Sequence, residues 1–179
     1  MLSKIRRYLG ALANQPDAYN VSKAIDSLYR NQVLNSAGLG IQGGSAAATW
    51  ATANVVNYMV EGVNATLAAQ SSKAVPNAIT WAAVASTFQA GAFLVTVDNA
   101  GTVATVPTNV GTGTSAAIAR ANIVWPVVPD GQVVVGVVII ANSAANVAFT
   151  AASTNLDATN ISTTFINTIG PFYPTTANQ

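Results

Sequence analysis

The chain contains no cysteine and no histidine among its 179 residues. Without cysteine it can form no disulfide and carry out no thiolate chemistry. Without histidine it lacks the commonest metal ligand and the side chain that most often serves as a general base near neutral pH. These absences exclude disulfide-stapled folds, histidine metal sites and the enzymes that depend on either residue.

Charged residues are also scarce, at 7% of the chain, against about 25% in an average protein. The apolar share is 51%, and the polar remainder is mostly Asn, Thr, Ser and Gln. The β-branched residues among them, Val and Thr, favour strands over helices. So little surface charge is typical of a protein that packs against copies of itself or against a large partner.

The few charges are unevenly distributed. The net charge is +3 through residue 30 and −2 over the rest of the chain. A basic front part is either a solvated helix without a partner or an arm that docks on one. Its positive side chains are Lys4, Arg6, Arg7, Lys23 and Arg30. The body offers no second basic patch with interleaved aromatic residues, so we expect no nucleic-acid partner.

No apolar run is long enough to span a membrane as a helix. The segment "IVWPVVPDGQVVVGVVIIAN" (123–142) breaks at Asn142 and holds far fewer than the ~18–20 consecutive apolar residues needed. The apolar stretch "YLGALA" near the start is shorter than the ~7 residues or more of a signal peptide. We therefore expect no membrane partner.

Because residues 132–142 show no polar alternation, they predict a strand buried on both faces, covered by a second sheet on one side and by another element or another subunit on the other.

Residues 1–37 show helical periodicity. The apolar residues recur at spacings of three and four: Ile5, Leu9, Leu12, Val21, Ile25 and Leu28. Two short amphipathic helices are expected, each needing a surface to lie on. Residues 38–47 are rich in Gly and Ser and predict a flexible hinge, followed by a β domain over residues 48–179.

In the β domain the apolar period changes to two. Glu61-Gly62 predicts a hairpin within residues 55–69, and Asp98-Asn99-Ala100-Gly101 a second one within 92–107. Further expectations are a loop and then a strand over 71–90, a loop and a helical turn over 109–125, and strands over 132–142, 146–151 and 161–169. This pattern predicts a mainly β fold, an antiparallel β-sandwich or barrel-like domain preceded by a short helical N-terminal arm.

The residues that catalysis needs are not grouped. The acidic residues occur singly, and Glu61, Asp98 and Asp130 lie in Gly-containing turns, where acidic residues are common. No glycine-rich phosphate-binding pattern is present. We expect no catalytic residue, no cofactor and no metal site, and hence no enzyme.

Two features allow more than one interpretation. Arg120 is either an exposed residue or a contact at a subunit boundary, where Asp130 or Asp157 would be natural partners. Each tryptophan is either a core residue or an exposed surface on which a glycan could stack; the three are Trp50, Trp81 and Trp125.

The order of motifs over residues 55–167 resembles that of a β-rich domain of tailed-bacteriophage structural proteins. The motifs are "NYMVEGVNATL", "FLVTVDNAGTV", "VWPVVPDGQVVVGVVIIAN" and "FTAASTNLDATNISTTFIN". The chain departs from that pattern at "AASTN", where a Gly-bearing turn is expected, and the arm has no equivalent in it. Capsid decoration (cement) proteins and head fibres carry domains of this kind.

The resemblance implies a virion protein without catalysis on the surface of an icosahedral capsid. It implies a homotrimer that binds the major capsid protein and reinforces the joints between capsid subunits. The docking residues would be those of the arm: Lys4, Ile5, Arg6, Arg7, Leu9, Lys23, Ile25, Leu28 and Arg30. The alternative within the same resemblance is a head-fibre or tail-associated protein whose β domain binds a host glycan.

Overall fold

The structure is a computed structural model, and it describes residues 30–44 and 47–171. This part of the chain is mainly β, and every strand pair in it is antiparallel. The expectation of a mainly β, antiparallel fold is thus confirmed. Most of the predicted arm, residues 1–29, lies outside the described residues.

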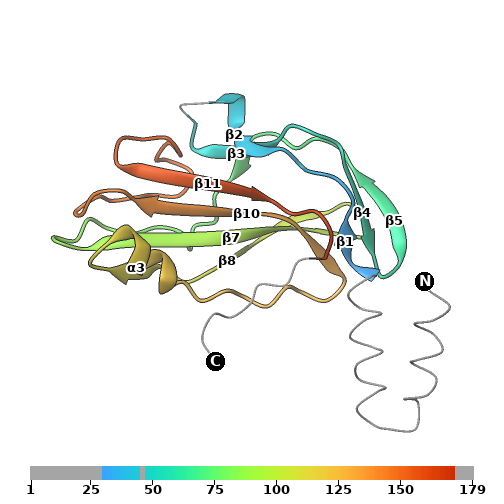
Figure 1. Ribbon diagram of the computed structural model, residues 1–179. Coiled ribbons are helices and arrows are strands. Elements are labelled where there is room, and N and C mark those ends of the chain that lie inside the picture. Colours follow the sequence, from blue (N-terminus) through green and yellow to red (C-terminus); the bar gives the residue numbers. More distant parts are fainter. Residues whose placement is uncertain (1–29, 45–46, 172–179) are drawn as a thin grey trace, which may run out of the picture.

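A large central sheet has the strand order β11-β10-β7-β8 (Figure 1). Its long strands are β7 (Phe88–Asp98) and β10 (Gln132–Asn142), and its flanking strands are β8 (Val103–Pro107) and β11 (Ile161–Asn167). The short strand β9 (Gly111–Gly113) pairs with the first residues of β7.

Two small sheets accompany the central one. The first has the order β1-β4-β5, from β1 (Gln32–Val33), β4 (Val56–Val60) and β5 (Val63–Leu67). The second has the order β2-β3-β6, from β2 (Leu39–Ile41), β3 (Thr49–Thr52) and β6 (Lys73–Ala74), and a short 3-10 turn covers Gln42–Gly44.

The turn residues explain both predicted hairpins. Glu61 and Gly62 have φ angles of 52° and 83° between paired Val60 and Val63, and positive φ at both central residues suits the twist of a two-residue hairpin. In the β7–β8 hairpin, the Gly101 amide donates to the Asp98 carbonyl at 3.1 Å. The strand expected over residues 132–142 is β10 itself.

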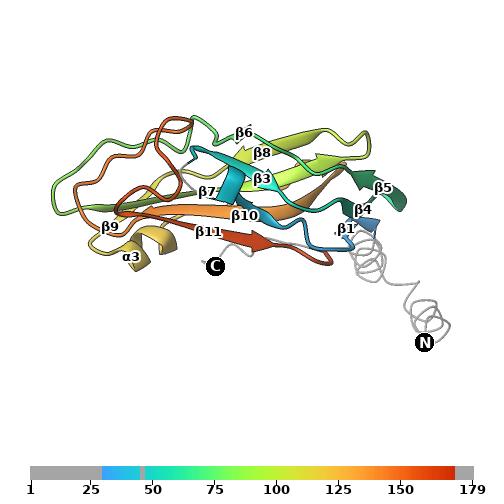
Figure 2. The same ribbon diagram turned by 90° about the horizontal axis from the view of Figure 1, so that it is seen from above.

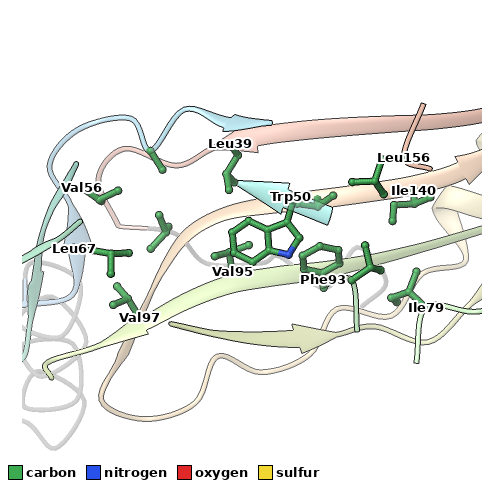
Figure 3. Close-up of a cluster of buried hydrophobic side chains, with 14 of the residues drawn as sticks. Leu39, Trp50, Val56, Leu67, Ile79, Phe93, Val95, Val97, Ile140 and Leu156 are labelled. Atoms are coloured by element: carbon green, nitrogen blue, oxygen red, sulfur yellow. The ribbon is translucent and has the colours of Figure 1, made fainter. Parts of the chain in front are cut away.

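The main core lies between one face of the central sheet, here called the inner face, and the two small sheets. Trp50 of β3 and Phe93 of β7 meet there, with ring centroids 6.2 Å apart, and the aliphatic residues of all three sheets surround them (Figure 3). Gly136 of β10 lets the side chain of Leu39 approach the central sheet closely, since a Cβ at residue 136 would lie 2.2 Å from Leu39 Cδ1.

The opposite, outer face of the central sheet is covered by the chain between β9 and β10. Helix α3 (Ala116–Ala121) begins at Ser115, whose side chain accepts a hydrogen bond from the Ile118 amide. It packs with Ala90, Ala92 and Ala141 in one cluster. The extended segment 123–130, which we call the strap, follows and lays Trp125 and Val128 over Leu94, Val134 and Val137. Both faces of β10 are therefore covered from within one chain, and no second subunit is needed for its burial.

Three sequence expectations about local structure are wrong. Gln32–Val33 forms a strand inside the segment expected to be helical through residue 37, because β4 supplies its backbone partners. The expected hinge at 38–47 contains β2, which pairs with β3 and buries Leu39. Residues 146–151 form no strand; Phe149 makes a single bridge to Trp81.

Within the described ranges, no helix is long and apolar enough to cross a membrane.

Candidate interaction surface at the arm pole

The arm joins the body next to the hairpin turn at Glu61-Gly62, which hydrogen-bonds to Arg30 and Asn31. The Gly62 amide donates to the Arg30 carbonyl at 3.0 Å, and the Glu61 amide donates to Asn31 Oδ1 at 2.7 Å. The backbone of Arg30 is therefore fixed, while its side chain is exposed. We call this end of the body, at the right of Figure 1, the arm pole.

Asp98 closes the β7–β8 hairpin at the same pole. Its Oδ1 accepts hydrogen bonds from the amides of Ala100 at 2.9 Å and Thr102 at 2.8 Å. The hydrogen bonds from Thr102, followed by those from Ala100 and Gly101, lower the pKa of the Asp98 carboxyl by favouring its charged form. The carboxylate thus stabilises the turn in its ionised state.

Tyr58 ties this hairpin to the small β1-β4-β5 sheet. Its phenol donates to the backbone carbonyl of Asp98 at 2.9 Å, and its ring is buried. Burial, and secondarily the negative charge of Asp98, raise the pKa of the Tyr58 phenol. The neutral phenol is the form that can donate this hydrogen bond.

A third acidic turn reaches the arm pole from the strap. Asp130 precedes Gly131, and a Cβ at Gly131 would lie 3.9 Å from Glu61 Oε1. The next residue, Gln132, pairs with Asp98 across β10 and β7. Three carboxylates from turns distant in sequence therefore lie at one end. They make no metal site, since no group of three or more potential ligand residues that could hold an ion occurs in the part of the chain described.

The end of the described chain returns to the arm pole as well. Val33 and Gly170 exchange backbone hydrogen bonds of 3.3 Å and 2.6 Å. Arg30 and Pro171, the first and last described residues, are three residues or fewer from this pair. The first and last residues of the described body thus lie at the same pole, next to the acidic turns.

The opposite pole differs in its chemistry. Its loops lie beyond the far ends of β7 and β10, beside α3 and β9 (Figures 1 and 2). Residues 82–86, with the sequence AAVAS, are all exposed, and residues 143–155 are an uncharged run of Ser, Ala, Asn, Val, Phe and Thr. The sequence predicts that Glu61, Asp98 and Asp130 lie in turns, but it does not show that these turns converge at one pole.

The predicted contact residues are distributed over both poles. Lys4, Ile5, Arg6, Arg7, Leu9, Lys23, Ile25 and Leu28 lie outside the described residues, and only Arg30 of the arm is placed. Arg120 is exposed, and its Nη2 donates to Ser162 Oγ of the same chain at 3.2 Å. Asp130 lies at the arm pole and Asp157 in an exposed loop after buried Leu156. A role for Arg120, Asp130 and Asp157 between subunits stays a prediction.

The tryptophans are part of the packing. Trp50 is buried and its indole N–H donates to the Ala74 carbonyl at 3.2 Å; Trp81 is buried against Phe149 and donates to the Val147 carbonyl at 3.1 Å. Trp125 is half-buried between the strap and the central sheet. The core interpretation holds for Trp50 and Trp81.

No family model, curated protein or solved structure matches this chain.

Proposed function

We propose that the protein is a capsid decoration protein that binds the outside of an icosahedral bacteriophage head through its basic arm and reinforces the joints between major capsid subunits. In this proposal the arm forms the short amphipathic helices expected from its sequence, the β body is an incomplete sandwich that stays outside the shell, and three copies associate. No catalytic step is involved.

The observation that carries the proposal is that the described body begins and ends at one pole, so that the arm is joined to it there. Arg30 is anchored by Gly62, and Gly170 by Val33. A body attached in this way can stand on a surface through its arm while its opposite pole projects outward. The arm carries most of the positive charge of the chain, which suits an acidic outer surface of a capsid.

The alternative, a head-fibre or tail-associated protein that binds a host glycan, has less support. Glycan stacking needs an exposed aromatic face, and Trp50 and Trp81 are buried. Quenching of tryptophan fluorescence by iodide distinguishes the two: we expect Trp50 and Trp81 to be shielded and Trp125 to be the partly accessible one. A chain whose tryptophans are all freely quenched would favour the glycan-binding alternative.

The test is binding to phage heads that lack the protein. Deletion of residues 1–29 leaves Arg30 and β1 in place, so the body should fold and lose binding. Neutralising the arm by Lys4→Gln, Arg6→Gln and Arg7→Gln should weaken binding and make it less sensitive to salt. Lys73→Gln, which removes a positive charge from the body, is the control and should leave binding unchanged. Full binding by the deleted chain would refute the docking role of the arm.

Oligomeric state is a separate test. A solution mass three times the 18.2 kDa of one chain, in a compact particle by negative-stain microscopy, is expected. A long fibre would contradict the decoration proposal and favour the head-fibre alternative.

A further inference from the structure

The strap joins β10 through an Asp-Gly pair. Asp130 is exposed, and the chain turns at Gly131, whose φ is 70°. Asp130 is also the only aspartate of the chain that precedes a glycine. Because glycine has no Cβ, its amide nitrogen can approach the carboxyl carbon of the preceding aspartate with little steric hindrance. The end of the strap is therefore the place where a ring closure between side chain and backbone is least obstructed.

Little holds the backbone on the strap side of this pair. Pro126 and Pro129 have no amide hydrogen, and no backbone group of residues 125–130 hydrogen-bonds to another described residue. Within the same described ranges the Gly131 amide has no hydrogen-bond partner either. The strap is held by the apolar contacts of Trp125 and Val128. Asp130 can thus rotate towards the Gly131 nitrogen without breaking a backbone hydrogen bond.

The two other aspartates that the structure describes are restrained. Oδ1 of Asp98 accepts two amide hydrogen bonds within its own turn, at 2.9 Å and 2.8 Å, which fix the carboxylate there. After Asp157 the attacking nitrogen would be that of Ala158, and it already donates to the Asn155 carbonyl at 3.1 Å. At both sites a hydrogen bond must break before a ring can close.

We propose that Asp130-Gly131 is a site of spontaneous aspartate isomerisation. The Gly131 nitrogen attacks Cγ of the protonated Asp130 carboxyl. The N–Cγ bond forms, the Cγ–OH bond breaks, and the hydroxyl leaves with the amide proton as water. Water then opens the resulting succinimide ring: addition at the original peptide carbonyl breaks its C–N bond and leaves isoaspartate, whereas addition at Cγ restores aspartate. No atom is gained or lost overall, and no other reactant is needed.

In the isoaspartyl chain the backbone runs through the Asp130 side chain and is one methylene longer between the strap and β10. The β10 side cannot readily take up this length, since Gln132 pairs with Asp98 and its Oε1 accepts a hydrogen bond from the Thr96 hydroxyl at 2.6 Å. The strap side has only side-chain packing to hold it. Isomerisation therefore loosens the strap, and Trp125 becomes more accessible to solvent.

The chemical step can be measured on the full chain aged at neutral pH. Endoproteinase Asp-N cuts before aspartate and not before isoaspartate, so digestion of the denatured chain reports each site separately. Resistance at Asp130 should accumulate at least about tenfold faster than at Asp98 or Asp157, and at a rate within about tenfold of that in a peptide of residues 126–136. Equal rates at the three sites, or a slower rate in the protein than this range allows, would overturn the proposal.

Asp130→Glu is the matched control for the effect on the strap. It keeps the negative charge, but its side chain would have to close a six-membered ring, which forms far more slowly. On ageing, quenching of tryptophan fluorescence by iodide should increase in the natural chain and stay constant in the variant. A natural chain that isomerises at Asp130 without any increase in quenching would overturn the claim that this bond holds the strap in place.

Discussion

The two faces of the central sheet are covered in different ways. The inner face packs large side chains, Trp50 and Phe93 among them, against two small sheets that both precede β7 in the sequence. The outer face packs alanines, Leu94 of β7, and Val134 and Val137 of β10 beneath the chain segment between β9 and β10. Small side chains on the outer face let a short helix and an extended strap lie close to the strands, so a third sheet or a second subunit is not required.

The largest effect should come from the inner face. Phe93→Ala removes a fully buried ring that touches Trp50, and we expect a loss of about 3–5 kcal/mol in the free energy of unfolding. Chemical denaturation followed by tryptophan fluorescence measures it. A loss below ~1 kcal/mol would mean that the small sheets do not pack on the central sheet as described.

The neighbouring residue tests the other face directly. Leu94 points to the outer face and is fully buried beneath the strap. Leu94→Ala should therefore cost about 2–4 kcal/mol, because the cavity it leaves lies between β7, β10 and the strap. If the outer face were open to water, the same substitution would cost less than ~1 kcal/mol, and the comparison between the faces would fail.

Close approach of α3 to β9 is the next feature to test. A Cβ at Gly111 would lie 2.2 Å from the carbonyl oxygen of Ala119, and a backbone atom has little freedom to move away. We expect Gly111→Ala to destabilise the fold by about 1–3 kcal/mol. Gly40→Ala is the control, since a Cβ there meets nothing within 4 Å; equal stability of the two variants would refute the close packing of α3.

The smallest effect concerns the turn at the arm pole. Because the folded-state pKa of Asp98 is lowered, its ionised form adds stability that is fully present above the unfolded-state pKa and is lost as the pH falls through the folded-state pKa. Asp98→Asn should lower the melting temperature slightly at neutral pH, and the difference from the natural chain should shrink as the pH falls below about 5 and through the folded-state pKa. A difference that does not change with pH would show that the charge of Asp98 is not what stabilises the turn.

Much of the fold could be predicted from local sequence signals. The Glu61-Gly62 and Asp98–Gly101 turns and the continuous run of β10 were recognisable because each carries its own signal: an acidic residue followed by a glycine that can adopt a positive φ in the turns, and a nearly continuous apolar run in the strand. The short strands β1 and β2 were not, since two or three residues show no period and a Gly-rich stretch looks the same in a hinge and in an edge strand. Phe149 was predicted to lie in a strand because it is flanked by β-forming residues, yet its burial depends on Trp81, far away in the sequence.

The candidate surface was predictable only in part. The basic character of the arm and the positions of Glu61, Asp98 and Asp130 in turns follow from the sequence. The meeting of Glu61, Asp98 and Asp130 at one pole depends on strand register, in particular the pairing of Gln132 with Asp98. The outer face of β10 could be covered by the strap of the same chain or by a second subunit. Which of the two occurs likewise depends on long-range packing that no local sequence pattern encodes.

Hydrogen exchange of the β10 amides, followed over a hundredfold dilution of the protein (~1 µM to ~100 µM), tests the central claim most directly. If one chain covers both faces of its central sheet, the amides of Val133–Ala141 should be among the slowest to exchange, at rates that do not change with protein concentration. Protection that appears only at concentrations where copies associate would contradict the account, because the outer face would then be covered by a second subunit.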